Sequence, residues 1–467
     1  MASFDNDIVS GNVVRSVVKL AWPIIITQLI AGIHGIIDHI LVGNYVLGKE
    51  GFYAQAAIGV SWQLFLVIVV FLSSLFHGMN ILIARYSGRQ DHDAVNRITY
   101  EVLITSGYLI LFVVAPLGYL LSPILLDLVN TQPEVQAHAL PYIRILFTAS
   151  LPLFLMFILN GAFQSSGNPK IPLYLGILTT ILNVVVSILL ITGPGPFPEL
   201  GAVGAAIGTC VAPVPAVVIG LWLIHTRRVV IGPPKRLSIK PDFGVLKSVA
   251  SLGLPAGIQA VLLNIGGAAL VGYIGSLEAS AQAQAAYVIC YGQLFSLVTW
   301  TGFGLRAACA TVMGQNMGAG KNARGKRAVY VGAVLGFLWA AAFGLVFWTI
   351  PDTLLGLFGI DDVIVLGFGS DLLRFLTFSG MFVAVTLAFT GGLQGAGDTR
   401  KPMYIAFVTQ IVVLLGICTV YQSMGRLTTS VIWTAILVSH MTRFVLTYIM
   451  FARGKWENIR VEIGQKA

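Results

Sequence analysis

Charged side chains are scarce in this chain. Only 10% of its 467 residues are Asp, Glu, Lys or Arg, whereas 57% are hydrophobic, and the mean hydropathy is +0.86. Soluble domains carry about 25% charged residues, so an ordinary soluble fold is excluded. The four cysteines fall in apolar stretches and lack the spacing of metal ligands: Cys210, Cys290, Cys309 and Cys418. We therefore expect packing residues rather than disulfides or a metal site.

The chain has long apolar segments in place of charge. About twelve segments of roughly 20 residues are each long enough to cross a bilayer as a helix. They lie at approximately 17–42, 56–80, 99–121, 138–162, 171–193, 202–225, 249–275, 283–313, 328–350, 370–393, 403–421 and 430–452. Their length, and the lack of short alternating strands, favour helices over a barrel. The sequence therefore predicts an all-α polytopic membrane protein.

The basic residues are distributed unevenly along the chain. A net charge of +9 would suggest a nucleic-acid partner in a soluble protein. Here 22 of the 28 Lys and Arg residues lie in the termini and in alternate connections, and the other connections hold only Lys49 and Arg426. Basic residues favour the cytoplasmic side of a membrane. We expect a multi-pass protein of the cytoplasmic (inner) membrane with both termini cytoplasmic, and no nucleic-acid partner.

The chain repeats itself at an offset of 230 to 232 residues. Residues 20–23 (Leu-Ala-Trp-Pro) return at 252–255 (Leu-Gly-Leu-Pro), and residues 164–174 return at 394–404 with Gln, Gly, a basic residue, Pro and Tyr in the same places. This length suits a duplicated six-helix unit, and an even number of helices gives both copies the same orientation. We expect two pseudo-symmetric six-helix bundles, an amino-terminal lobe (1–225) and a carboxy-terminal lobe (249–467), joined by a basic cytoplasmic linker (226–248).

Asp38 is an acid inside the first apolar segment. A carboxylate at membrane depth costs at least about 2.5–3.5 kcal/mol, so it normally faces a water-filled cavity or a polar partner and marks a transport pathway or proton relay. His34 lies one helical turn earlier on the same face. The alternative is that Asp38 lies near the outer end of the helix and is simply solvated.

Arg306 is a candidate cavity residue in the second half of the chain. It lies twelve residues before Gly318, about 18 Å along a helix and so near the bilayer centre. It is either a structural contact or part of the cavity, where it would disfavour cations and favour an acidic substrate group. Other candidates for a substrate cavity are polar or aromatic, although each aromatic residue can equally pack against lipid or helices: Gln28, Trp62, Phe65, Asn264, Tyr287, Tyr291 and Phe295.

Together these patterns resemble the multidrug and toxic compound extrusion (MATE) family of secondary transporters over nearly the whole chain. The resemblance rests on Pro23 with Asp38, on the Gln-x-x-Gly-x-x-Lys/Arg-x-Pro turn of both halves, and on Asn183 followed by Pro-Glu-Leu-Gly at 198–201. It implies two six-helix lobes forming a V, alternating access, and export of organic, amphipathic, drug-like compounds in exchange for protons, with sodium less favoured. It implies no cofactor, a small organic substrate, and a monomer in the bilayer.

The resemblance also implies ion-coupling positions in the amino-terminal lobe. The positions that match the family are Asp38, Tyr142, Asn160, Asn183 and Thr209, with Pro23 as the hinge. Ser187 replaces a second acid, which leaves Asp38 as the only buried carboxylate expected there and makes a multi-carboxylate sodium site less favoured. The acids through which some members couple in the other lobe are absent here, so coupling is expected in the amino-terminal lobe.

Two other functions remain open from the sequence. A flippase for lipids or lipid-linked precursors, built on a related fold, would be expected to line its cavity with several basic residues and often to have more than twelve helices. A membrane-embedded enzyme would need a convergent nucleophile, base or metal cluster, which the sequence does not show. Export of small organic compounds is therefore the favoured interpretation, and no enzymatic activity is expected.

Overall fold

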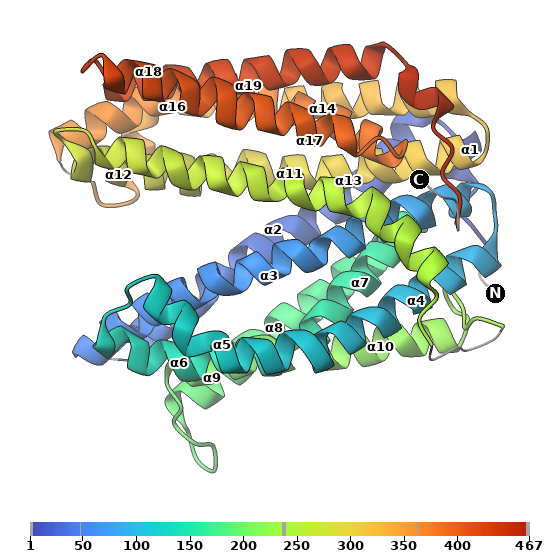
Figure 1. Cartoon of the computed structure of the whole chain (residues 1–467), viewed down its shortest axis with the longest axis horizontal. Coiled ribbons are helices and arrows are strands. Elements are labelled where there is room, and N and C mark those ends of the chain that lie inside the picture. Colours follow the sequence, from blue (N-terminus) through green and yellow to red (C-terminus); the bar gives the residue numbers. More distant parts are fainter. Residues whose placement is uncertain (1–2, 47, 236–239, 361, 464–467) are drawn as a thin grey trace. The chain divides into compact units, whose positions relative to one another are not determined.

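The computed structural model describes residues 3–46, 48–235, 240–360 and 362–463 (Figure 1). Helices fill most of this part of the chain, and it contains no strand, which confirms the predicted fold class. Eleven helical stretches are long and apolar enough to cross a membrane. A twelfth span is present if α6 (Pro133–Thr148) and α7 (Leu151–Ser165), which are bent by 50° relative to each other, are counted as one. The prediction of about twelve spans is confirmed.

The chain divides into two compact units. Unit 1 comprises Met1–Asp5, Ile26–Gly253 and Glu462–Ala467, and unit 2 comprises Asn6–Ile25 and Leu254–Val461. Two long helices therefore belong to both units: α2 (Val13–Tyr45) and α11 (Phe243–Gly275). This differs from the predicted lobes, because residues 6–25 pack with the second half of the chain and most of the predicted linker packs with the first half.

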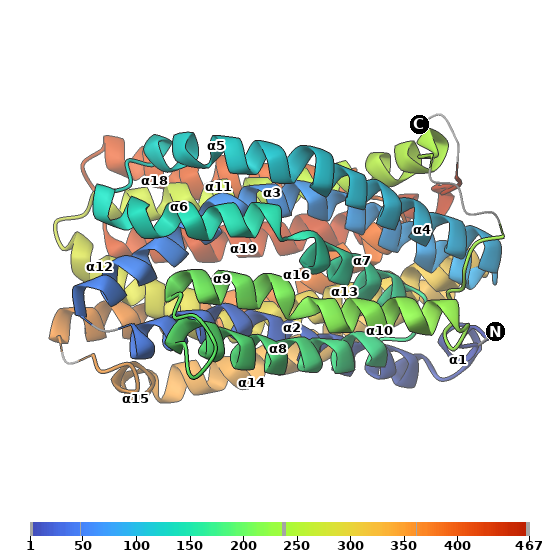
Figure 2. The same cartoon turned by 90° about the horizontal axis from the view of Figure 1, so that it is seen from below.

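Unit 1 is built around α3. Besides its parts of α2 and α11, it contains α3 (Gly48–Gly88), α4 (His92–Leu109), η1 (Ile110–Val114), α5 (Ala115–Leu128), α6, α7, α8 (Lys170–Thr192), α9 (Ala202–Val211) and α10 (Pro213–His225). Helix α3 packs against α4, α6 and α7, and α8 packs against α9 and α10 (Figure 2). Phe65 of α3 lies inside this core, with its ring 5.5 Å from that of Phe147 and 5.9 Å from that of Phe154.

Unit 2 is built around α16. It contains α1 (Asp7–Ser10), α12 (Ser280–Tyr287), η2 (Val288–Leu294), α13 (Ser296–Gly318), α14 (Asn322–Thr349), α15 (Pro351–Gly356), α16 (Val363–Gly395), α17 (Arg400–Phe407), η3 (Val408–Leu415), α18 (Gly416–Ser423), α19 (Thr429–Ala452) and η4 (Lys455–Asn458). Helix α16 packs against α13, α14 and α19 (Figure 1). Apolar residues of the amino-terminal segment are buried in the same core: Ile8, Val17, Leu20, Ala21 and Ile24.

The repeated turn motif adopts the same backbone in each unit. Gly167 and Gly397 have positive φ angles of 96° and 92°, which favour glycine because it has no Cβ. In both turns the N–H of the following residue donates to the carbonyl five residues earlier, which is a common helix-ending pattern. The next helices begin at Lys170 and Arg400. The predicted equivalence of these two turns is thus supported by their local geometry.

The linker predicted at 226–248 is held on α4 of unit 1. The N–H of Gly232 donates to Asn96 Oδ1 at 2.7 Å, and Lys235 forms an ion pair with Asp93. Farther along, Arg97 forms an ion pair with Asp242, the last residue before α11. Since three side chains of one helix face hold it, the described part of the linker is a docked segment rather than a free connection.

Glu101 is a buried carboxylate in the first half of the chain. Its side chain is buried on α4 and accepts a hydrogen bond from the backbone N–H of Asp242. The prediction that Asp38 is the only buried carboxylate of this half was therefore wrong. Glu101 is buried because it anchors the start of α11, a partner 141 residues away in sequence.

Neutralising Asp242 is expected to loosen this docking. The hydrogen bond from Arg97 is the main cause that holds the pKa of Asp242 below its ordinary value of 3.8. A lowered folded-state pKa stabilises the fold at pH values above 3.8 and loses that contribution as the pH falls through the folded value. Asp242→Asn should therefore raise trypsin cleavage after Lys240 about two- to fivefold at neutral pH, as expected for an exposed ion pair.

The matched control for this experiment is Asp371→Asn. Asp371 also pairs with an arginine at the surface, Arg374, at 3.5 Å, but in unit 2. Trypsin cleavage after Lys240 in the Asp371→Asn variant should equal that in the wild type. Equal cleavage in Asp242→Asn and Asp371→Asn would show that the Arg97 pair does not hold the linker.

Candidate functional site

A buried polar cluster lies between α8 and α9 of unit 1. Asn183 Nδ2 donates to Thr209 Oγ1 at 3.2 Å and to Ser187 Oγ at 3.5 Å. All three side chains are buried. The two helices approach closely because residue 208 is glycine: a Cβ at Gly208 would lie 2.2 Å from Ser187 Oγ. The structure thus brings three of the predicted ion-coupling residues into contact.

Two further predicted residues lie on helices that pack against this cluster. Tyr142 is fully buried on α6, which packs against α9, and Asn160 is half-buried on α7, which packs against α8 and α9. The Oδ1 atoms of Asn160 and Asn183 are buried and accept no hydrogen bond from the described residues. A buried acceptor without a donor costs about 1–3 kcal/mol. Each of these amide oxygens can therefore accept a hydrogen bond from a donor group that enters the site.

Asp38 and His34 lie within the range of α2, but their side chains are outside the described residues. Their predicted roles therefore stay predictions. On the same helix Gln28 is half-buried, and Pro23 is buried within a helix that continues without a break from Val13 to Tyr45.

Replacing Asn183 with leucine is expected to disrupt the cluster. Asn183→Leu keeps a similar branched shape but removes the amide that donates to Ser187 and Thr209, so the folded state should lose about 1–3 kcal/mol. Thermal unfolding of the purified protein measures this loss. The control is Asn264→Leu, because Asn264 is exposed and, within the described part of the chain, donates only to the carbonyl of Ala260 in its own helix, at 2.9 Å. Equal melting temperatures for the two variants would contradict this account of the cluster.

Several predicted cavity residues are instead part of a packed core. Phe65 is fully buried among aromatic rings and presents no surface to a ligand. Trp62 is half-buried beside it, with ring centroids 5.7 Å apart. Phe295 is likewise fully buried, in unit 2. For Phe65 and Phe295 the structure shows packing where the sequence analysis expected a cavity wall, since apolar residue type alone does not distinguish the two.

A second polar cluster, in unit 2, is centred on Arg443. Its Nε donates to Thr409 Oγ1 at 3.0 Å and its Nη2 donates to Gln410 Oε1 at 2.6 Å. Arg443 lies nine residues before the end of α19, about 14 Å along the helix and so within the membrane span. Arg443 was not among the site residues predicted from the sequence. The signal was present, because an arginine inside an apolar span marks a functional site by default.

Aromatic rings form a stack beside Arg443. Tyr287 lies between Trp433 and Tyr291, with centroid distances of 6.2 and 5.1 Å. Tyr291 continues to Phe295 at 5.2 Å, and His440 lies 6.3 Å from Phe295 and 6.5 Å from Tyr291. The structure therefore brings Tyr287, Tyr291 and Phe295 together with His440, one helical turn before Arg443. Their role in a substrate cavity stays a prediction.

Two π-helical segments shape the Arg443 cluster. Tyr291 lies in η2, and Thr409 and Gln410 lie in η3. A π-helical turn widens the backbone and is frequent at functional sites. The approach of η3 to α11 is also close, because a Cβ at Gly266 would lie 2.1 Å from Gln410 Cγ.

Arg306 lies on α13, also in unit 2. It is half-buried, and its guanidinium carbon is 5.3 Å from the centroid of the Phe303 ring. The only acid within the membrane spans of this unit is Asp371, which is exposed and paired with Arg374. Unit 2 therefore carries more positive than negative charge within its spans.

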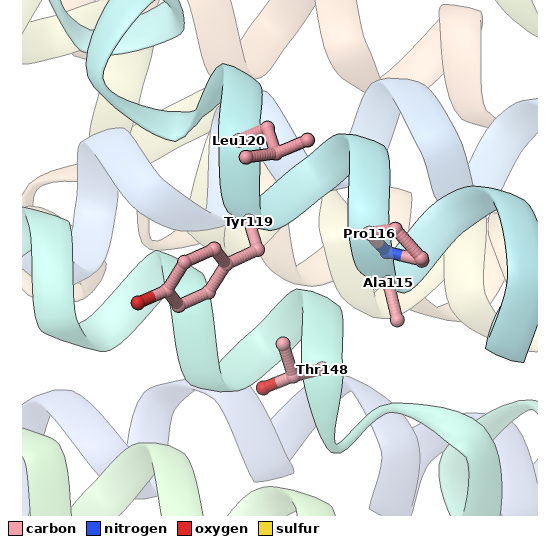
Figure 3. A pocket seen from close by; sticks show the side chains of 5 residues that line it. All are labelled: Ala115, Pro116, Tyr119, Leu120 and Thr148. Atoms are coloured by element: carbon pink, nitrogen blue, oxygen red, sulfur yellow. The ribbon is translucent and has the colours of Figure 1, made fainter.

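A shallow cavity of about 450 Å³ lies on unit 1 between α5 and α6 (Figure 3). Its lining residues are Ala115, Pro116, Tyr119, Leu120 and Thr148. Arg144 lies next to it, with its guanidinium carbon 4.3 Å from the centroid of the Tyr119 ring. Four of the five lining residues are exposed, and a binding site needs convergent polar groups that this lining does not supply. We do not consider it the candidate site.

The family model of MatE matches residues 23–189 and again residues 255–420, which together make up more than half of the chain. The chain belongs to the MatE family. The two matches begin 232 residues apart, at 23 and 255, which confirms the internal duplication found in the sequence. The resemblance to MATE transporters is thereby confirmed, and the chain is a membrane transporter rather than an enzyme.

Relatives of similar length match the chain over most of its residues. The chain is 24% identical over 446 residues to the probable multidrug resistance protein NorM of Thermotoga maritima, covering 95% of this chain and 93% of that protein. It is 24% identical over 447 residues to the multidrug export protein MepA of Staphylococcus aureus, covering 94% of each. A solved structure of a multidrug resistance MATE family transporter in an outward-facing conformation matches with a TM-score of 0.88, at 19% identity, covering 98% of this chain and all of that one. The last comparison shows the fold alone.

Proposed function

We propose that this MatE family member exports amphipathic, drug-like organic compounds in exchange for protons. The relatives named for multidrug resistance or export match it from end to end, which supports this class of cargo. The basic residues of alternate connections support insertion in the cytoplasmic membrane with both termini in the cytoplasm. The protein acts in this proposal as a monomer.

The observation that carries proton coupling is the chemistry of the cluster of Asn183, Ser187 and Thr209. These three described side chains are an amide and two hydroxyls, which suits a proton better than a cation that needs several charged oxygens. A protonated carboxyl group can donate a hydrogen bond, whereas an ionised one only accepts. In this proposal a protonated Asp38, a residue of the same unit, donates to the Oδ1 of Asn183, which accepts no hydrogen bond from the described residues.

Two proline-containing helices supply the conformational change in this proposal. The chain passes from unit 2 to unit 1 between Ile25 and Ile26, and back between Gly253 and Leu254. Pro23 and Pro255 lie within three residues of these points, inside α2 and α11. A proline removes a backbone hydrogen bond and permits bending. Bending of α2 and α11 at these prolines would let each unit move when Asp38 changes its protonation state, which is the basis for alternating access.

Transport in proteoliposomes with separately imposed gradients tests the proposal. A proton gradient directed opposite to the movement of the compound should drive its accumulation, and a sodium gradient of equal size at uniform pH should not. Accumulation driven by sodium alone, or equal accumulation with no ion gradient, would contradict proton exchange.

A further inference from the structure

Unit 2 holds an arginine inside the membrane span whose hydrogen-bond partners are neutral. Both acceptors of Arg443 are uncharged: the hydroxyl of Thr409 and the side-chain carbonyl of Gln410. The only acid in the spans of this unit, Asp371, is exposed and already paired with Arg374. A charge at membrane depth is normally paired, because leaving it without a counter-ion is costly.

One edge of the Arg443 guanidinium donates hydrogen bonds to Thr409 and Gln410, and the other edge is available to a ligand. Nε and Nη2 are used, while Nη1 forms no hydrogen bond within the described part of the chain, and the side chain keeps part of its surface exposed. Thr409 is fully buried and Gln410 is nearly so, and these two acceptors fix the orientation of the guanidinium plane. A guanidinium fixed in this way is preorganised for a planar anion such as a carboxylate.

The neighbouring side chains are suited to the same ligand. His440 lies one turn before Arg443, is 7% exposed, and its Nδ1 has no hydrogen-bond partner among the described residues. The tautomer with a proton on Nδ1 would offer a second donor. Tyr291 is half-buried beside it and presents an aromatic face. Helices α11, α12, η2, η3 and α19 contain no acid. Helix α16, which also packs against α19 and η2, carries one within its described span, Asp371, which is exposed and paired with Arg374.

We propose that Arg443 binds an anionic group, either a carboxylate of the exported compound or a small free anion, with Gln410 and Thr409 positioning the guanidinium and Tyr291 contacting the adjoining apolar part. This inference rests on the proposed export function, because it assigns a negative charge to part of the exported compound. It accounts for a cation inside the span that no acid neutralises. Compounds that carry a net positive charge alone should bind unit 2 poorly.

The full-length protein in nanodiscs tests this binding without any gradient. Calorimetric titration at pH 7.5 compares 2-naphthoate with 2-naphthamide, which has the same rings but no charge. We expect the wild type to bind naphthoate at least about tenfold more tightly, a difference of about 1.4 kcal/mol. Arg443→Gln should remove that preference, and Arg374→Gln should keep it, because Arg374 is already paired at the surface.

Two further variants distinguish a loss of anion binding from misfolding. Arg443→Lys keeps the charge without the fork and should keep a reduced preference. Gln410→Glu places an internal carboxylate on the guanidinium, so it should abolish the preference while preserving or raising the melting temperature.

A second measurement distinguishes the source of the anion. If chloride fills the site, sodium chloride should raise the melting temperature of the wild type more than sodium isethionate at equal ionic strength, and Arg443→Gln should lose that difference. The site is supported if the wild type shows either the naphthoate preference or the chloride effect and Arg443→Gln loses it. Loss of the naphthoate preference identifies the anion as a carboxylate of the cargo. If neither depends on Arg443, the inference is overturned, whatever the result for proton coupling.

Discussion

Asp38→Asn is expected to fold and insert like the wild type but to lose proton-driven export, with a fall of about tenfold or more. Asparagine has nearly the shape of a protonated aspartate, and it cannot release a proton to the cytoplasm. The neutral groups of the cluster, Asn183, Ser187 and Thr209, offer no acid to take over this role. Uptake of an amphipathic dye into proteoliposomes under an imposed pH gradient, at equal protein content, measures the effect.

The matched control for this prediction is Glu101→Gln. Glu101 is a buried carboxylate of unit 1 that accepts a hydrogen bond from the backbone N–H of Asp242. Its substitution by the amide should leave the dependence on the pH gradient intact, even if the protein is less stable. Full gradient-driven transport by Asp38→Asn would rule out Asp38 and move attention to His34.

Gly253→Val is expected to abolish correct folding. Glycines of α3 and α11 meet in unit 1: a Cβ at Gly78 would lie 1.9 Å from the carbonyl oxygen of Val249, and a Cβ at Gly253 would lie 1.8 Å from that of Ser74. Both obstacles are backbone atoms, so the helices must separate to admit any side chain. Overpacking of this kind costs about 1–3 kcal/mol or more, and it removes the close helix contact that small residues allow in membranes.

Size-exclusion chromatography of a fluorescent fusion measures this effect as the fraction of protein in a monodisperse peak. Gly272→Val on the same helix is the control, since a Cβ there would meet no atom within 4 Å. The two variants carry the same residue and the same change in helix propensity, so a difference reports the contact alone. Equal yields of monodisperse protein would show that α3 and α11 do not cross as closely as described.

Local chemistry explains what the sequence predicted correctly. The length of each apolar segment is a local property, and it was sufficient to give the helical membrane fold and about twelve spans. The equivalent turns at Gly167 and Gly397 were also recognisable, because a positive φ angle requires a particular residue at a particular place. The grouping of Asn183 with Ser187 came from the resemblance to the family, and their spacing of one helical turn agrees with the contact between them.

Features that depend on distant partners were not predictable in this way. The apolar pattern of residues 6–25 shows that one face is buried, but not that it packs in unit 2. Glu101 is buried because of Asp242, far away in sequence, and Phe65 has the same composition whether it lines a cavity or fills a core. Arg443 is different: its position inside the last span was visible, but its partners Thr409 and Gln410 are not recognisable without the fold.

Proton movement driven by the exported compound tests proton exchange most directly, because coupling between two ligands is reciprocal. Proteoliposomes with a pH indicator inside, and with no initial pH or sodium gradient, receive a gradient of an amphipathic dye whose charge does not change with pH. Protons should move against the direction of the dye in the wild type and not in Asp38→Asn. Dye movement without any change of pH in the wild type, or a requirement for sodium, would contradict the account.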